Sequence, residues 1–379
     1  MLSPFIINNS PLSLERFPSN QVNRSLQAWD ASDEYLINYA QQEQLIKPNS
    51  NILVFNDSFG AISLNFLNNP TFSVNDSFVS QQGLLQNLKK NQLNRQNLTL
   101  LSSLDDLPTD IDVIFYKIPK NKTLLAEQLI AIKNTLRSNV VFIAADKAKN
   151  IQSATLKIFE KYLGTTTTSL AVKKSRLVFC QLNSSNKFSL PLINRWPLES
   201  NQLNISNRAN VFSRDKLDIG ARFFLEHLPT LRGNQSVIDL GCGNGVIGLS
   251  LLKKHPEIAL SFVDESYMAI ASAKDNVSDN LPHLLKQCQF QVNDCLSNLA
   301  AQSVDVILCN PPFHQQNATT DHIAWQMFKD SYKALKKGGE LRIIGNRQLG
   351  YHIKLKRIFA NETLIASNKK FVILSAIKL

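Results

Sequence analysis

The sequence is poor in cysteine, and the few cysteines it has form no metal-binding pattern. The five thiols are Cys180, Cys242, Cys288, Cys295 and Cys309. Their number is odd, and none of their spacings matches the paired short intervals that zinc sites use. We therefore expect no metal site, and we expect a protein whose thiols stay reduced in the cytoplasm.

Long apolar runs and a targeting segment are missing as well. No stretch of the sequence comes near the length of about 18 consecutive apolar residues that a membrane-spanning helix needs. The beginning of the chain has neither the basic region nor the apolar stretch of a secretory signal. The sequence thus predicts neither a membrane-bound nor an exported protein.

Glycine is scarce in the first half of the chain. Only Gly60, Gly83 and Gly164 of the 13 glycines lie within residues 1–200. A site that presses backbone against a cofactor needs glycine, because a Cβ atom blocks the approach and the loop needs unusual dihedral angles. The scarcity argues against a cofactor site in the first half.

Length and composition predict two globular domains with a basic surface. The 379 residues exceed one ordinary domain, and a 44% share of hydrophobic residues supports two cores. The net charge of +11 is divided between the halves, with +5 in residues 1–199 and +6 in residues 200–379. This distribution fits a phosphate-facing surface, although a merely basic protein has the same totals.

The second half is organised around residues 236–248, Ser-Val-Ile-Asp-Leu-Gly-Cys-Gly-Asn-Gly-Val-Ile-Gly. The apolar run that ends in an acid predicts a buried parallel strand. The alternate glycines predict a loop that a ligand can approach, and a helix is predicted over 246–252. Free N–H groups at that helix start suit an anionic or carboxylate-bearing cofactor.

The spacing of these glycines differs from the dinucleotide fingerprint Gly-x-Gly-x-x-Gly. It resembles motif I of the S-adenosylmethionine (SAM) methyltransferases. That resemblance implies that the cofactor is held by Asp239, Gly241, Cys242, Gly243, Asn244 and Gly245.

Two more predicted strands end in polar residues. The strand over 260–265 ends in Asp264 and Glu265, about 25 residues after the motif I acid, near the spacing at which a carboxylate binds ribose hydroxyls. The strand over 289–292 is followed by Asn293 and Asp294, which suit the adenine amino group of SAM; Asp294 would equally cap a helix. Because ligands bind at the carboxyl ends of such strands, we expect one shared cofactor site.

A further predicted strand, over 305–309, ends in Asn310-Pro311-Pro312-Phe313, because proline cannot donate to the sheet. The tetrapeptide resembles that of methyltransferases that modify a planar nitrogen. An amine on guanine or adenine is a poor nucleophile, since its lone pair is delocalised into the ring. We expect Asn310 and the Pro311 carbonyl to accept its N–H groups, the prolines to stiffen the loop, and Phe313 to stack on the base. Asn310 also borders the cofactor site.

His314, the next residue, either reaches the target base or is a polar residue of the rim. We do not expect it to act as a general base, because the proton can leave for water after methyl transfer.

The first half repeats this layout in degenerate form. A strand over 51–55 is followed by a predicted helix that starts at Gly60. When Gly60 is aligned with Gly245, Asn56 and Ser58 fall where the first two loop glycines stand. We therefore expect a duplication whose first copy has lost the residues that the chemistry needs.

Lysines replace the planar-nitrogen motif in the first copy. Lys117 falls at the position of Asn310 and Lys120 at that of Phe313, with Lys122 close by. These lysines either contact RNA phosphates or belong to a solvated loop.

The segment before the catalytic half holds further candidates. Phe212, Arg214, Asp218 and Gly220 precede a helix over 221–228, and they either shape the cofactor pocket or cap and pack that helix. The domain boundaries follow from composition: a first domain over 1–190, a linker rich in Asn, Ser and Pro over 191–207, and a catalytic domain over 208–379.

The end of the chain is basic. A strand over 340–344 is followed by Asn346 and Arg347, candidates for RNA contact at the edge of the site. The helix over 351–359 carries three cationic side chains, which face either phosphates or solvent. Other helices are expected over 28–47, 148–163, 267–280 and 320–335, the last ended by Lys336-Lys337-Gly338-Gly339, and an antiparallel hairpin is expected over 363–366 and 371–377.

The motifs together resemble the ribosomal RNA guanine-N2 methyltransferases. The matching segments are 211–220, 241–248, 262–269 and 309–316, so the resemblance is strong over 205–379 and looser over 1–195. It is closest to the branch that acts on 23S RNA, and next to the branch that acts on 16S RNA.

This resemblance implies an α/β fold of two tandem class I, Rossmann-like SAM-methyltransferase domains. Each would have a mixed seven-stranded sheet with a closing antiparallel hairpin, and the first would be a degenerate, noncatalytic copy that helps to hold RNA. SAM is the expected cofactor, ribosomal RNA is the expected partner, and we expect a monomer.

The predicted reaction is methylation of the exocyclic N2 of one guanine in 23S ribosomal RNA. Three alternatives stay open: the same reaction on 16S RNA, methylation of another planar nitrogen such as adenine N6 or glutamine N5, and a SAM-binding ribosome-assembly factor without turnover. A duplicated basic half favours a large structured RNA. The presence of Asn310 and Phe313 argues against a protein that only binds.

Overall fold

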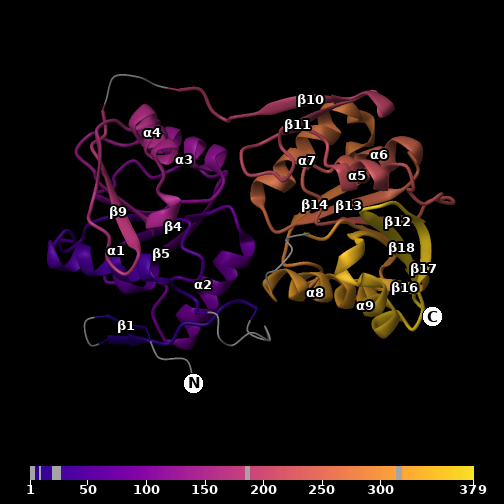
Figure 1. The fold of residues 1–379 in the computed structure, drawn as a ribbon, viewed down its shortest axis with the longest axis horizontal. Coiled ribbons are helices and arrows are strands. Elements are labelled where there is room, and N and C mark those ends of the chain that lie inside the picture. The colour runs from indigo at the N-terminus through magenta and orange to yellow at the C-terminus, as the bar shows by residue number, and fades with distance from the viewer. Residues whose placement is uncertain (1–4, 8–9, 19–26, 184–187, 313–317) are drawn as a thin grey trace. The chain divides into compact units, whose positions relative to one another are not determined.

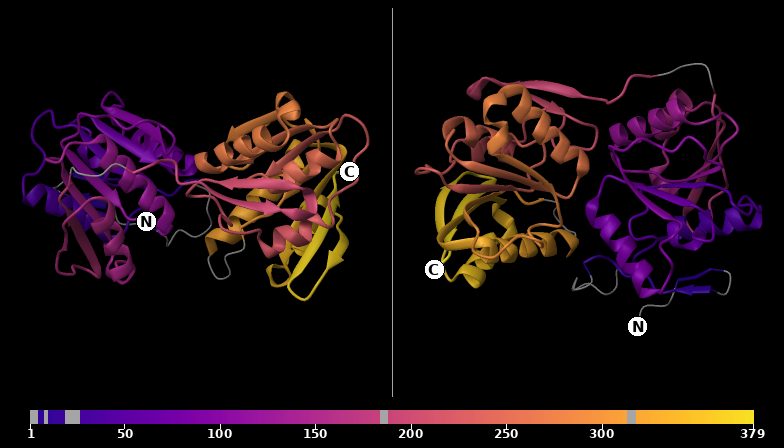
Figure 2. Two further views of the ribbon diagram at one scale, coloured as in Figure 1. Left: turned by 90° about the horizontal axis from the view of Figure 1, so that it is seen from above. Right: turned by 180° about the vertical axis from the view of Figure 1, so that it is seen from behind.

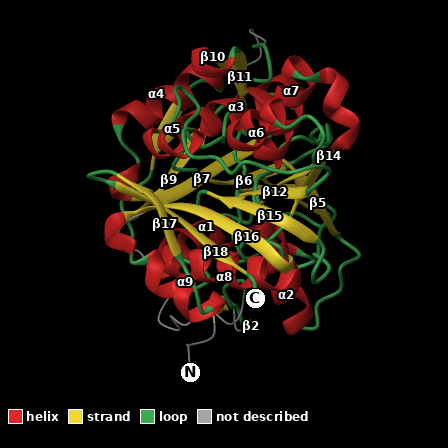
Figure 3. Ribbon diagram, turned by 90° about the vertical axis from the view of Figure 1, so that its right-hand side faces the viewer, coloured by secondary structure: helices red, strands yellow, loops and turns green. Residues whose placement is uncertain are grey.

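The computed structural model describes residues 5–7, 10–18, 27–183, 188–312 and 318–379. The chain divides into two compact units, Met1–Leu192 and Ile193–Leu379 (Figure 1). Each unit contains a seven-stranded mixed sheet with helices on both faces, as the further views show (Figures 2 and 3). The expected pair of Rossmann-like α/β domains is confirmed.

The first unit has the strand order β5-β4-β3-β6-β7-β9-β8, in which β9 pairs in antiparallel fashion with both β7 and β8 and the other pairings are parallel. Its strands are β3 (Ile52–Phe55), β4 (Thr71–Asn75), β5 (Leu98–Ser102), β6 (Val113–Lys117), β7 (Val141–Lys147), β8 (Thr166–Thr168) and β9 (Ser175–Cys180). Its helices are α1 (Ala31–Gln42), α2 (Phe78–Lys90), α3 (Lys122–Thr135) and α4 (Ser153–Tyr162). A small hairpin, β1 (Phe5–Ile7) with β2 (Ser10–Leu12), precedes them.

The second unit has the strand order β14-β13-β12-β15-β16-β18-β17. Its sheet strands are β12 (Ser236–Leu240), β13 (Ala259–Asp264), β14 (Cys288–Val292), β15 (Val304–Cys309), β16 (Leu335–Asn346), β17 (Thr363–Ser367) and β18 (Phe371–Ile377). Its helices are α5 (Ile219–Leu225), α6 (Val246–Lys254), α7 (Tyr267–Asn280), α8 (Ala318–Ala334) and α9 (Tyr351–Phe359).

The two sheets have the same topology, strand for strand. The central strand, the crossovers and the closing antiparallel pair follow in the same order in both. Registers agree too: Phe55 pairs with Tyr116 in the first unit, as Leu240 pairs with Cys309 in the second. Lys117 therefore stands where Asn310 stands, which supports the predicted duplication.

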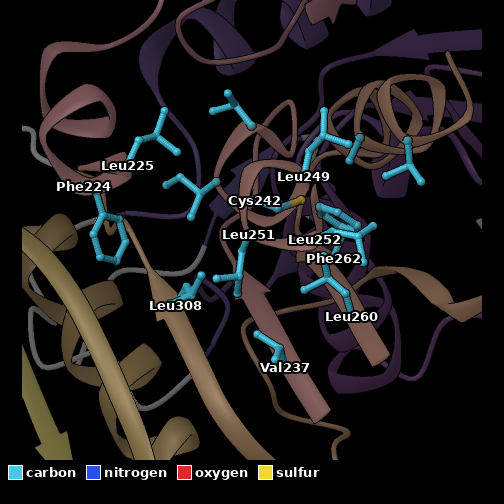
Figure 4. Close-up of a cluster of buried hydrophobic side chains, with 14 of the residues drawn as sticks. Phe224, Leu225, Val237, Cys242, Leu249, Leu251, Leu252, Leu260, Phe262 and Leu308 are labelled. Atoms are coloured by element: carbon cyan, nitrogen blue, oxygen red, sulfur yellow. The ribbon is translucent and has the colours of Figure 1, made fainter. Parts of the chain in front are cut away.

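The central strands β3, β6, β12 and β15 are apolar along most of their length and are buried on both faces of their sheets. In the second unit, α5, α6 and α7 pack on one face, and α8 and α9 pack on the other. Figure 4 shows the first of these layers, where Phe224 of α5 and Leu251 of α6 lie among Val237 and Leu308 of the strands. The rigid sheet fixes the positions of the loops at its edges.

The expected linker over 191–207 is mostly not a linker. Residues 194–207 form a hairpin, β10 (Asn194–Leu198) with β11 (Leu203–Asn207), which belongs to the second unit. Leu198, Leu203 and Ile205 are buried in the core of that unit. The Asn-rich and Ser-rich composition suggested a linker, but alternate apolar residues anchor the segment instead.

Several expected helices have different limits. The helix expected over 28–47 is shorter, because it begins after the capping side chain of Asp30. The prediction of a helix that starts at Gly60 is wrong. Only a 3-10 turn, Ser63–Phe66, occurs there, since Pro70 and the next strand follow at once. Residues 336–339 lie within β16 rather than in a loop, although α8 does end before them.

No helix within the described parts of the chain is both long enough and apolar enough to cross a membrane.

Candidate active site

Four parallel strands bring the predicted site residues to one edge of the second sheet. β14, β13, β12 and β15 are neighbours in this order and all run in the same direction. The loop over 241–245, Asp264, the pair Asn293 and Asp294, and Asn310 each follow one of these strands. The expected common site is therefore assembled, with Phe313 and His314 outside the described residues.

The glycine loop leaves open space beside its backbone. Gly241, Gly243 and Gly245 have φ angles of +69°, +54° and +77°, which L residues rarely adopt. A Cβ atom at Gly245 would lie 2.9 Å from the Cβ of Ala273, so packing alone requires glycine there. A Cβ atom at Gly243 would have no atom within 4 Å. The open side of the loop is thus at Gly243, where a cofactor can approach the backbone.

Asp239 supports the loop from below instead of facing it. Its side chain is 1% exposed, and its Oδ2 accepts the N–H of Gly248 in α6 at 2.8 Å. Burial raises the pKa of Asp239 to about 7, although the hydrogen bond from Gly248 acts in the opposite direction. Asp239 therefore positions the helix and the loop, and its expected contact with the cofactor stays a prediction.

Asn244 and Cys242 are also buried beneath the loop. Asn244 donates to Asn207 of β11 at 2.8 Å and accepts the N–H of Val246 at 3.1 Å, while its carbonyl accepts from Asn276 of α7 at 2.9 Å. Burial raises the pKa of Cys242, so it is a neutral thiol. These two residues hold the loop rather than a ligand. Asn207 and Asn276 were missed because nothing in their local sequence marks them.

Asp264 borders the open side of the loop. Its Oδ2 accepts the N–H of Gly243 at 2.9 Å, and its Oδ1 accepts the N–H of Ser266 at 3.0 Å. These bonds fix a half-buried carboxylate beside the accessible backbone, whereas Glu265 is exposed. The position fits the expected ribose contact.

Asn293 and Asp294 have different tasks. The Oδ1 of Asn293 accepts the N–H of Asp294 at 3.0 Å, and it also accepts from the side chains of Ser297 and Asn298. Asn293 therefore caps the turn after β14, the task considered for Asp294. Asp294 itself is 8% exposed at the edge of the site.

Asn310 has the most telling environment of the site. Its Oδ1 is buried and has no hydrogen-bond partner among the described residues. A buried acceptor without a partner costs roughly 1–3 kcal/mol, so a substrate N–H that bonds to it would recover that free energy. Pro311 beside it is buried and Pro312 is half-buried. The edge of the sheet thus holds a fixed acceptor that a substrate N–H can satisfy.

Lys117, the counterpart of Asn310 in the first unit, is neither solvated nor placed to meet RNA. Its Nζ lies 3.0 Å from Asp30, 2.6 Å from Asp33 and 2.5 Å from the Oγ of Ser32, and its side chain is 15% exposed. Both alternatives considered for this lysine are therefore wrong. The ion pairs of Lys117 thus occupy, in the first unit, the position that Asn310 holds in the second.

The loop of the first unit is also satisfied internally. The carboxylate of Asp57 accepts the N–H groups of Gly60, Ile62 and Ser63 at 3.1, 3.1 and 2.7 Å. These are the donors that an anionic ligand would meet at the start of a helix. The first copy has therefore replaced a ligand by its own side chains.

For one residue in the segment before α5, the structure favours a role in capping the helix over a role in the cofactor pocket. Asp218 caps α5 by accepting the N–H of Ala221 at 2.9 Å, and Gly220 is buried in its first turn. Phe212, in contrast, is 61% exposed.

Comparison with known proteins agrees with this arrangement. A family model described as the RLMG N-terminal domain matches residues 3–184, and one described as the methyltransferase small domain matches residues 202–375. The ribosomal RNA large subunit methyltransferase G of Colwellia psychrerythraea is 58% identical over 391 residues, covering 100% of both chains. The chain belongs to the ribosomal RNA large subunit methyltransferase G family. The protein of the same name from Pseudoalteromonas translucida is 50% identical, covering 98% of this chain and 97% of that one.

A solved structure supports the fold over the whole chain. The T. thermophilus 16S rRNA N2 G1207 methyltransferase, RsmC, determined in complex with AdoMet and guanosine, has a TM-score of 0.77 and 18% identity. The alignment covers 100% of this chain and 98% of that one. Family membership confirms the predicted family and methyl transfer to ribosomal RNA, and this likeness confirms the class I fold.

Proposed function

We propose that the chain methylates the exocyclic N2 of one guanine in 23S ribosomal RNA. The observation that carries the proposal is the buried Oδ1 of Asn310, which has no hydrogen-bond partner among the described residues and lies at the cofactor edge of the sheet. Relatives that are 58% and 50% identical over nearly the whole chain are named as large-subunit ribosomal RNA methyltransferases. The RNA class comes from these relatives, and the chemistry comes from the site.

The residues around the glycine loop fit the cofactor. The open backbone at Gly243 and the carboxylates of Asp264 and Asp294 would hold SAM, while Asp239 and Asn244 keep the loop in place. Once bound, SAM supplies an electrophilic methyl group on its sulfonium centre.

Asn310 and Pro311 would present the nucleophile. The Oδ1 of Asn310 and the carbonyl of Pro311 accept the two N–H groups of the guanine amine, which turns the nitrogen lone pair out of conjugation and toward the methyl group. The two prolines restrict the loop, so little ordering is left for substrate binding. Phe313 stacks on the extruded base. The rate then comes from positioning rather than from a strong base.

The neighbouring thiols take no part in this chemistry. Burial raises the pKa of both Cys242 and Cys309, so neither is a thiolate at neutral pH. Methyl transfer would thus occur directly to the base, without a covalent intermediate on the protein.

The first unit would support the RNA without catalysis, because its equivalent site is filled by its own side chains. We further propose that the enzyme works as a monomer, needs no metal ion and acts in the cytoplasm, where the ribosomal RNA is.

The test is incubation of the purified chain with methyl-labelled SAM and, in parallel, 23S RNA, 16S RNA and isolated ribosomal subunits. Digestion to nucleosides should give label in N2-methylguanosine from 23S RNA alone. Label from 16S RNA would change the substrate, and label in adenosine or in protein would remove the guanine assignment. Binding of SAM without label transfer to any of these would indicate an assembly factor.

A further inference from the structure

The last part of the chain carries most of its net charge. Residues 341–379 contain eight Lys and Arg and a single acid, Glu362. Residues 200–340 contain 13 Lys and Arg and 14 Asp and Glu, so they are nearly neutral. The positive charge of the second unit therefore belongs to its last strands and last helix, and the sheet topology decides where that charge lies.

β16 brings one cation to the edge where the site lies. It runs parallel to β15, with Ile343 opposite Cys309, so Asn310 leaves the sheet beside the last residues of β16. β16 ends at Asn346, and Arg347 follows. At about 3.3 Å per residue, Arg347 lies roughly 10 Å beyond the level of Asn310, one strand across.

β18 adds two more cations beside the first. Phe371, the first residue of β18, pairs with the last residue of β16, so Lys369 and Lys370 precede it at the same edge. The N–H of Arg347 donates to the carbonyl of Lys370 at 3.0 Å, and its guanidinium donates to the carbonyl of Asn368 at 3.1 Å. We call Arg347, Lys369 and Lys370 the basic rim.

The basic rim is exposed and lacks counter-ions. All three side chains are exposed, and none forms an ion pair with a carboxylate in the described part of the chain. On the other side of Asn310, the same edge of the sheet carries Asp264, Glu265 and Asp294. The edge of the sheet is therefore acidic on the side of Asn310 where the cofactor fits, and basic on the other side of Asn310.

We propose that the basic rim binds the phosphates of the RNA strand next to the target nucleotide, so that the strand crosses the ends of β16 and β18. The proposal rests on the proposed function for the identity of the substrate. A polyanion is attracted to unpaired cations and repelled by the carboxylates on the cofactor side, and this contrast sets the direction of approach. Phosphate contacts fix the register of the strand and thereby help to aim the guanine at Asn310.

The first arm of the test is the triple variant R347Q/K369Q/K370Q in the full-length chain. The expected result is a loss of affinity for 23S RNA of about tenfold or more near physiological salt. The slope of log affinity against log salt should fall by about 2, since each phosphate contact to a single strand contributes about 0.7. SAM affinity by calorimetry should stay within about twofold of the wild type, because the rim lies away from the cofactor side of the edge.

The matched control is K254Q/K286Q/K337Q, which removes the same charge from the opposite edge of the sheet. All three lysines are exposed: Lys254 ends α6, Lys286 precedes β14, and Lys337 lies near the start of β16. The control should keep RNA affinity and salt slope close to those of the wild type. An equal loss in both variants would mean that only net charge matters, and would overturn the proposal.

Two further outcomes also count against the basic rim. Unchanged RNA affinity in the rim variant removes it as a contact, and weakened SAM binding would assign it to the cofactor site instead. RNA binding is measured directly, without methyl transfer. If the wild type forms no N2-methylguanosine while the rim variant alone loses RNA affinity, the proposed function fails and the basic rim stands.

Discussion

Burial has different consequences for two polar side chains at the edge of the second sheet. Asp239 is 1% exposed, so burial disfavours its negative charge and raises its pKa to about 7, although the N–H of Gly248 stabilises the carboxylate. Asn310 is neutral, and its buried Oδ1 has no hydrogen-bond partner in the part of the chain that the structure describes. The first residue stabilises the shape of the cofactor loop, and the second is ready for a ligand.

Asn310→Ala should separate binding from turnover. We expect kcat to fall by about 10²–10³, the loss typical when one positioned polar partner of the transition state is removed. SAM affinity by calorimetry should stay near the wild-type value, and the melting temperature should change little, because the lost oxygen has no described partner. Asn310→Asp, which keeps an acceptor oxygen, is the control. Loss of SAM binding in Asn310→Ala would show that the site is misassigned.

Asp239→Asn should change how stability depends on pH. Because the pKa is near 4 in the unfolded chain and about 7 in the fold, the folded state binds the proton more tightly, and the wild type loses stability as pH rises from 4 to 7. The variant lacks this loss. Its free energy of unfolding relative to the wild type should therefore increase by at most about 3 kcal/mol between pH 5 and pH 8. Urea denaturation at both pH values measures this, and a pH-independent difference would contradict it.

At the scale of elements, the two units differ most in the loops at the carboxyl ends of equivalent strands, where a ligand would bind. The loop after β12 continues into α6, whereas the loop after β3 closes on the Asp57 carboxylate and forms only a 3-10 turn. The β10–β11 hairpin has become part of the second core, with Ile205 fully buried.

Ile205→Ala should destabilise the second unit by about 2–5 kcal/mol, because it leaves a cavity under the hairpin. Ile353→Ala on α9 removes the same atoms from a side chain that is 65% exposed, and it should change stability by less than about 0.5 kcal/mol. Chemical denaturation of the full chain tests both. Equal effects would mean that the hairpin is a loosely attached linker after all.

At the scale of the whole molecule, one fold occurs twice and only one copy keeps a site. The strand orders are identical, yet the position of Asn310 holds Lys117 in the first unit, bound to Asp30 and Asp33. Retaining the fold while filling the site leaves a basic domain, which we propose supports the RNA substrate.

Calorimetric titration of the full-length chain with SAM should therefore give one site per chain. The Gly243 loop has open space beside its backbone, whereas the equivalent N–H groups of the first unit are already bound to Asp57. Gly243→Val, which fills that space at a positive φ angle, should abolish binding altogether. A stoichiometry of two, or residual binding in the variant, would place a second site in the first unit.

The sequence alone determined the fold class, the duplication and the set of strand ends that form the site. Periodic apolar strands, alternate glycines and a strand-ending Pro-Pro depend on local backbone preferences, so a linear pattern reveals them. Only the tertiary structure decided that Asp239 and Asn244 support the loop, that Lys117 is an internal ion pair, and that residues 194–207 join the second core. Those outcomes depend on partners distant in the chain, and a local pattern does not specify which distant residues those partners are.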